Sequence, residues 1–168
     1  RVSMKEHLLK CANFNLWANK RITDKLNDID PDLWLKEQKS SFRTIRETLL
    51  HIYDAETIWY KRLNGESLKD FPGKDYKGTN EEVIEILLNV SNDFIELVKN
   101  NSDEYFSSSC NFRSLDGTEY NTKVSDIVQH CMNHSTFHRG QIVTMLRFCG
   151  IDELPSTDYI TYIRQIED

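Results

Sequence analysis

The chain has 168 residues, of which 39% are hydrophobic and 29% are charged. This length and composition fit a single globular domain, residues 1–168, and exclude a disordered chain. Lys and Arg number 21 against 27 Asp and Glu, so the formal net charge is −6. Nucleic-acid binding is therefore not expected, because phosphate contacts need a basic surface.

The sequence predicts neither a membrane span nor a secreted protein. No stretch approaches the roughly 18 apolar residues of a spanning helix, and the N-terminal residues lack the apolar segment of a signal peptide. The chain has four cysteines, and no two of them have the CxxC spacing: Cys11, Cys110, Cys131 and Cys149. Free thiols of this kind are typical of a reducing compartment, so we expect a soluble, cytoplasmic protein.

Two long helices are predicted in the first half of the chain. Apolar residues at a spacing of four predict a helix over residues 4–27, which ends before a proline. The second helix begins at Thr44, since Thr44 and Glu47 have the spacing of a capping box, and it ends near Gly65. Residues 66–78 contain proline and glycine and are predicted to form a loop.

Two more long helices are predicted in the second half. A capping box opens the third helix at Thr79, and a broad apolar face follows it. Residues 101–121 have the weakest helical pattern, and the Asp116–Gly117 pair within them favours a tight turn or a short hairpin. The fourth helix covers residues 123–149, and a short helix follows Pro155. Four long helices joined by loops predict an all-α four-helix bundle with a short C-terminal helix.

Histidines are the candidate metal ligands. His130, His134 and His138 lie four residues apart on the predicted fourth helix, so neighbouring pairs share one face and form two overlapping HxxxH windows. The spacing does not choose between the two windows. His51 on the second helix is the candidate for a further ligand, and His7 is a weaker alternative.

Other polar residues near these histidines have less specific interpretations. Asp54 and Glu56 follow His51 closely, and either side chain could orient an imidazole or accept a proton. A solvated surface carboxylate is the favoured interpretation for both. Arg139 and Gln141 point away from the ligand face, so they are expected to tie their helix to a neighbour rather than to contact a substrate.

Three segments carry a resemblance to a known family. HxxNHSTFHRGQIVTMLRFCGIDELPSTDYITYIR, residues 130–164, resembles the C-terminal signature of the DinB/YfiT-like family. FNLWANKR, residues 14–21, is similar to its first-helix motif, and LLHIYDAETIWYKRL, residues 49–63, is similar to its second-helix motif. The resemblance spans nearly the whole chain in the family's order.

The resemblance implies an up-down-down-up four-helix bundle, usually a homodimer, that holds one divalent metal ion, typically zinc or nickel. Matched residue by residue, the family's ligand positions fall on His51, His134 and His138, whereas His130 matches a frequent position that is not a ligand. All three ligand positions therefore hold histidine in this chain.

The family resemblance also suggests a chemistry. Three neutral imidazoles leave a coordination position open, and similar family members include transferases that use a low-molecular-weight thiol such as bacillithiol or mycothiol. The sequence and the resemblance together predict a metal-dependent transferase or hydrolase that acts on a small molecule. A low-molecular-weight thiol is the expected cosubstrate of the transferase. Two alternatives stay open: a non-enzymatic metal-binding stress-response protein with a structural ion, and a helical interaction module with incidental histidines.

Overall fold

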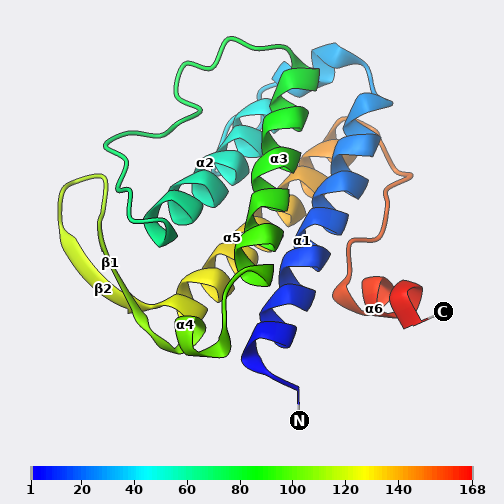
Figure 1. Cartoon of the computed structure of the whole chain (residues 1–168). Helices are drawn as coiled ribbons and strands as arrows, with labels where there is room; N and C mark the ends of the chain where they lie inside the picture. Colours follow the sequence, from blue (N-terminus) through cyan, green and yellow to red (C-terminus); the bar gives the residue numbers. More distant parts are fainter. Residues whose placement is uncertain (1, 168) are drawn as a thin grey trace.

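The computed structural model describes residues 2–167, and four long helices form its body. These helices are α1 (Met4–Asn27), α2 (Ile45–Leu63), α3 (Asn80–Lys99) and α5 (Val124–Phe148). In Figure 1 α1 rises from the N-terminus, α2 and α3 both descend, and α5 rises again. The up-down-down-up bundle is thus confirmed. Because α2 and α3 run in the same direction, the loop between them has to return along the length of the bundle.

Helices that follow each other in the chain are not always neighbours in space. α1 packs against α3 and α5, and α2 packs against the same two helices, so α1 and α2 lie on a diagonal of the bundle. Their connection contains a 3-10 helix, η1 (Pro31–Leu35), which anchors it. Trp34 in η1 is only 2% exposed, and its indole N–H donates a 3.1 Å hydrogen bond to the carbonyl of Leu26.

A short helix and a β-hairpin connect α3 to α5. They are α4 (Asp103–Ser107), β1 (Ser109–Arg113) and β2 (Glu119–Lys123), and the two strands pair antiparallel with Phe112 opposite Tyr120. Gly117 has a φ of 88°, which is the left-handed conformation that the predicted turn requires. The hairpin expected from the Asp116–Gly117 pair is therefore confirmed.

The helix ends follow the capping signals with one difference. Thr79 and Glu82 close a reciprocal capping box, whereas at α2 the Glu47 carboxylate accepts the backbone N–H of Arg43 instead of that of Thr44. Thr44 still accepts the backbone N–H of Glu47 through its hydroxyl. The C-terminal helix, α6 (Tyr159–Glu167), packs against α1.

The bundle interior contains two large apolar clusters with a polar layer between them, and a third, small cluster joins α1 to α6. One cluster includes Trp34, Ile45, Leu49, Leu87 and Ile142. The other large cluster includes Leu8, Phe94, Phe106, Val128 and Cys131. Polar residues lie between these clusters along all four long helices. Within residues 2–167, no helix combines the length and the apolar character needed to cross a membrane.

Candidate metal centre

Neighbouring helices α2 and α5 bring three histidines together. His51 on α2 lies two residues after the buried Leu49, beside the apolar stripe that faces the interior. The His51 side chain is half-buried. His134 and His138 are one helical turn apart on α5. Because α2 packs directly against α5, all three imidazoles meet in one place.

The ring nitrogens of these histidines converge. Nε2 of His134 lies 3.0 Å from Nε2 of His51 and 3.2 Å from Nε2 of His138, and one nitrogen from each residue lies within 4.8 Å of the others. Tetrahedral zinc with bonds of roughly 2.0–2.1 Å places its ligand nitrogens about 3.3 Å apart. The arrangement therefore fits a divalent ion held by three imidazoles.

A side-chain hydrogen bond fixes the tautomer of one histidine. Nδ1 of His138 lies 2.7 Å from Oε1 of Gln141, and the amide nitrogen of Gln141 donates to Oγ of Ser41 at 2.8 Å. Since the amide oxygen only accepts, Nδ1 of His138 carries the proton and Nε2 keeps its lone pair for a metal. Nδ1 of His134 is buried without a hydrogen-bond partner among residues 2–167.

Burial keeps the imidazoles neutral. Desolvation, with a smaller contribution from His138, lowers the pKa of His51 to about 4. Desolvation, followed by the charges of the neighbouring histidines, lowers the pKa of His134 to about 4. Metals bind the neutral form of histidine, so both rings are in the metal-binding form at neutral pH.

Aromatic side chains form the walls of the site. The Phe42 ring stacks on His51 with the ring centroids 4.2 Å apart, and it approaches His138 edge-on at 5.8 Å. A pocket of about 350 Å³ opens beside His51 and is lined by Phe42, Phe71 and Asp54 among others. A small molecule in this pocket would contact His51, which is the one clustered histidine in the pocket lining.

Asp54 does not orient an imidazole, and its interpretation as a solvated carboxylate was wrong. It is 7% exposed, and its Oδ1 accepts the backbone N–H of Gly73 at 2.5 Å. Burial raises the pKa of Asp54 to about 6, more than the Gly73 hydrogen bond lowers it. The carboxyl therefore titrates close to neutral pH at the side of the pocket.

Glu56 was also wrongly predicted to be a surface residue, because it is fully buried at the centre of the polar layer. Its carboxylate accepts hydrogen bonds from side chains on the other three long helices, namely Asn15 at 2.9 Å, Asn19 at 3.1 Å, Ser91 at 2.6 Å and Ser135 at 3.0 Å. Ser135 is adjacent to His134 in the chain. The Glu56 contacts thus fix the rotation of α5 that turns His134 and His138 toward α2.

Arg139 is also part of this polar layer and connects α5 to α1, in line with the expectation that it links its helix to a neighbouring one. The guanidinium donates to Oδ1 of Asn15 at 2.6 Å and to Oδ1 of Asn19 at 2.8 Å. Arg139 is 2% exposed, and burial lowers its pKa to about 10, opposed by the charge of Glu56. Polar residues on apolar helix faces, such as Asn15, Asn19 and Ser91, were the sequence signal for this layer.

The remaining histidines lie outside the cluster. His130 is exposed, and its ring centroid lies 6.1 Å from that of His134 and 5.2 Å from that of Trp59. His7 lies near the start of α1, where its Nε2 approaches the sulfur of Cys11 at 3.7 Å. Of the two HxxxH windows that spacing left open, the structure thus brings His134 and His138 together with His51.

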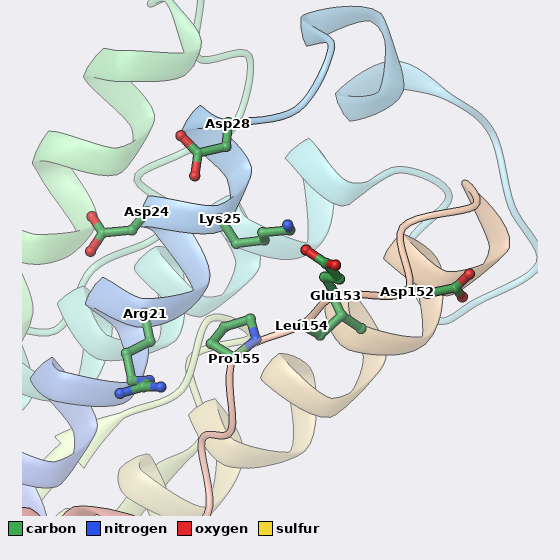
Figure 2. A pocket seen from close by; sticks show the side chains of 8 residues that line it. All are labelled: Arg21, Asp24, Lys25, Asp28, Asp152, Glu153, Leu154 and Pro155. Carbon is green, nitrogen blue, oxygen red and sulfur yellow. The ribbon is translucent and has the colours of Figure 1, made fainter.

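A different hollow lies on the surface between α1 and the segment that follows α5. Its volume is about 720 Å³, and Figure 2 shows its charged lining, with Asp24 on α1, Asp28 directly after α1, and Asp152 and Glu153 on the later segment. None of the three clustered histidines lines it. The pocket beside His51, although smaller, is therefore the one relevant to a metal centre.

Comparisons with known proteins agree with this architecture. The sequence profile of the DinB family matches residues 4–168. The protein DinB of Bacillus subtilis is 27% identical over 167 residues, which cover 95% of each chain.

Two solved structures share the fold at low sequence identity. YfiT from Bacillus subtilis is 14% identical with a TM-score of 0.67, covering 86% of this chain and 89% of its own, and it is described as a probable metal-dependent hydrolase with an unusual four-helix bundle topology. A DinB-like protein from Bacillus cereus is 16% identical with a TM-score of 0.64, covering 83% of this chain and 89% of its own. From the profile match over nearly its full length, this chain belongs to the DinB family.

Proposed function

We propose that this protein is a metal-dependent enzyme, a hydrolase or a thiol transferase, that acts on a small molecule. One divalent ion would be held by His51, His134 and His138. The observation that carries the proposal is the convergence of three neutral imidazole nitrogens, with no carboxylate among them, beside a pocket of about 350 Å³. The description of YfiT, a protein of similar fold, as a probable metal-dependent hydrolase also supports a metal-dependent activity for this protein.

The chemistry follows from the ligand set. A divalent ion with three neutral ligands keeps its charge and an open position, so it lowers the pKa of a bound water or thiol toward neutral pH. Imidazole ligands suit both zinc and nickel. Phe42 and Phe71 give the pocket apolar walls, and Asp54, with a pKa of about 6, is the candidate to exchange a proton with the reacting molecule.

A non-enzymatic protein with a structural ion is the second candidate. The hydrogen-bonded layer around Glu56 and Arg139 argues against it, because this layer joins all four long helices through protein atoms alone. A structural ion is expected where a fold lacks such internal support. Homodimer formation and a cytoplasmic location stay predictions that rest on the family resemblance and the cysteine content.

Metal content is the first test. Protein purified without a nickel column is analysed by plasma mass spectrometry, and the expected result is about one zinc, nickel or similar ion per chain. His134→Ala should lose the ion, whereas His130→Ala is the matched control on the same helix and should keep it. Wild-type protein that binds no ion after incubation with several divalent metals would exclude the proposal.

Turnover is the second test and separates the two chemistries. Metal-loaded protein is assayed with ester and amide substrates for hydrolysis. Thiol transfer is assayed with a low-molecular-weight thiol and a chloronitrobenzene, where the sulfur replaces chloride on the ring and hydrogen chloride is released. Activity that disappears in His134→Ala supports the enzyme. Full metal loading with no turnover in either assay would favour the second candidate.

A further inference from the structure

Arg62, in the last turn of α2, has an unusual environment. It is only 7% exposed, and its guanidinium carbon lies 4.4 Å from the ring centroid of Trp59 and 4.7 Å from that of Phe112 on β1. The two rings are themselves 5.2 Å apart and nearly perpendicular. The guanidinium is therefore held in the corner between two aromatic side chains.

The described part of the chain offers this buried cation no counter-ion. Among residues 2–167 Arg62 takes part in no ion pair, and its Nε is buried without a hydrogen-bond partner. Arginine is seldom buried without a partner, because desolvation of an unpaired charge is costly. Stacking on two aromatic faces offsets part of this cost but satisfies none of the N–H donors.

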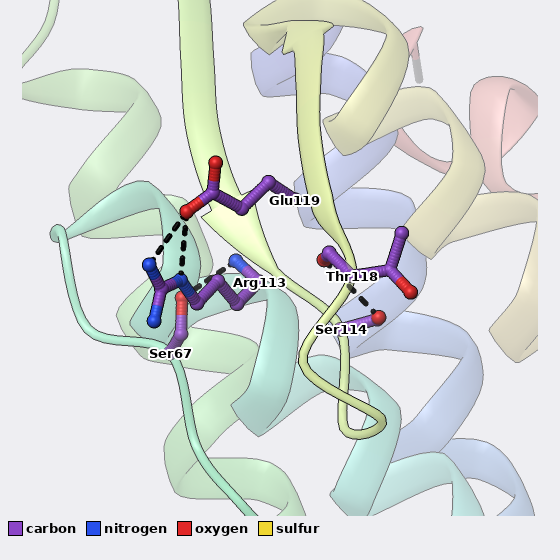
Figure 3. A network of polar contacts seen from close by, with 5 residues as sticks. All are labelled: Ser67, Arg113, Ser114, Thr118 and Glu119. Atoms are coloured by element: carbon purple, nitrogen blue, oxygen red, sulfur yellow. Dashed lines mark hydrogen bonds and ion pairs between the residues drawn. The ribbon is translucent and has the colours of Figure 1, made fainter.

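Arg113 on the hairpin shows the more common environment of an arginine, which is an ion pair with a carboxylate. Arg113, adjacent to Phe112, donates to Oε1 of Glu119 through its Nε at 3.1 Å and its Nη2 at 2.5 Å, as Figure 3 shows. Arg113 is also solvent-exposed. The Glu119 carboxylate is thus already engaged and does not serve Arg62.

Arg62 lines a cavity of about 520 Å³ between the end of α2, the hairpin and the start of α5. The other walls are mainly apolar and include Trp59, Phe112, Tyr120 and Ile127. The volume falls within the range of small-molecule sites, which are typically apolar with a few polar groups that orient the ligand. The Asp126 carboxylate also lines the cavity, but it is solvent-exposed, so water and salt screen its repulsion of a bound anion.

We propose that this cavity binds a flat aromatic carboxylate, whose anionic group pairs with the guanidinium of Arg62 and whose ring lies among Trp59, Phe112 and Tyr120. A carboxylate matches the planar N–H donors of arginine and can accept two hydrogen bonds in parallel. The site requires no metal ion, so it is independent of the proposed enzymatic function. His130 also lines this cavity, whereas none of the three clustered histidines does.

The test compares a charged with a neutral probe of the same shape. Naphthalene-2-carboxylate and naphthalene-2-carboxamide are titrated into the full-length, metal-free protein by isothermal titration calorimetry. Saturable binding of the carboxylate is expected, with the amide at least about tenfold weaker, because a hydrogen-bonded ion pair is lost. Equal affinity for the two probes, or a carboxylate Kd weaker than about 1 mM, would overturn the proposal.

Matched variants locate the binding site. Arg62→Met keeps an apolar side chain but removes the charge, and it should weaken carboxylate binding at least about tenfold while leaving amide binding nearly unchanged. Arg113→Met removes a nearby charge outside the cavity and should bind the carboxylate as the wild type does. Equal losses in the two variants would mean that the net charge of the hairpin region, not Arg62, attracts the anion. If Arg62→Met does not fold, the comparison of the two probes on the wild type still decides.

Discussion

Nδ1 of His138 lies 2.7 Å from Oε1 of Gln141, three residues further along α5. This contact links the candidate ligand to a residue that does not itself face the three nitrogens. Gln141 in turn donates to Ser41 in the connection before α2, so the orientation of the His138 ring depends on two parts of the chain. Such hydrogen bonds to metal-binding histidines set the tautomer and strengthen the ligand.

The first prediction concerns this hydrogen bond. Gln141→Leu should weaken metal binding about 10–100-fold, because His138 loses the acceptor that keeps Nε2 free for the ion. Gln141→Glu retains an acceptor and is the matched control, with affinity equal to or above that of the wild type. Competition with a chromogenic chelator measures both. An unchanged affinity in Gln141→Leu would show that the Gln141 contact does not hold the ring.

The second prediction concerns the buried carboxylate at the centre of the bundle. Glu56→Ala should lower the free energy of unfolding by about 3–5 kcal/mol, because it leaves the buried charge of Arg139 without the nearby negative charge and removes the acceptor of the four side-chain hydrogen bonds. Urea unfolding followed by circular dichroism gives the value. Glu85→Ala, at an exposed position on α3, is the control and should change stability by no more than about 0.5 kcal/mol. Similar small effects in both variants would contradict the central role of Glu56.

The third prediction concerns removal of the metal. Chelation should leave the helical content unchanged, because the contacts of Glu56 with Ser91 and Ser135 hold the helices through protein atoms. Stability should fall only by the mass-action contribution of a ligand that binds the folded state. Far-ultraviolet circular dichroism before and after chelation tests this. A large loss of helix on chelation would support a structural ion instead.

The sequence predicted the four long helices and the placement of the histidines on two of them, because those signals are local. Thr79 with Glu82 marks a helix start wherever the helix packs, and Gly150, with its φ of 82°, follows the end of α5 as glycine commonly does. The spacing of His134 and His138 places them on one face of any helix. These features depend on a few neighbouring residues and not on the fold.

The errors have a common physical cause, which is burial by distant parts of the chain. Glu56 is covered by α1, α3 and α5, and Asp54 is covered by the loop at Gly73, so neither environment can be inferred from α2 alone. The choice between the two HxxxH windows also depends on a distant part of the chain. It requires the position of His51 relative to α5, and spacing along α5 does not contain that information.

The last prediction uses the raised pKa of Asp54. A carboxyl with a pKa of about 6 when folded and 3.8 in its ordinary state binds more protons in the folded than in the unfolded protein between these values. Its contribution to stability is therefore most favourable below about pH 4, decreases as the pH rises to about 6, and is constant above that.

Asp54→Asn removes this titration but keeps an oxygen that can accept the Gly73 N–H, so the variant should gain stability relative to the wild type as the pH rises from about 4 to 6. Urea unfolding of both metal-free proteins at several pH values measures the difference, and the histidine contributions cancel because both proteins contain them. A difference that is independent of pH, or that shrinks as the pH rises, would mean that Asp54 titrates in its ordinary range. It would then lose its place as the proton-exchanging group of the pocket, since a carboxyl with that pKa is fully ionised at neutral pH.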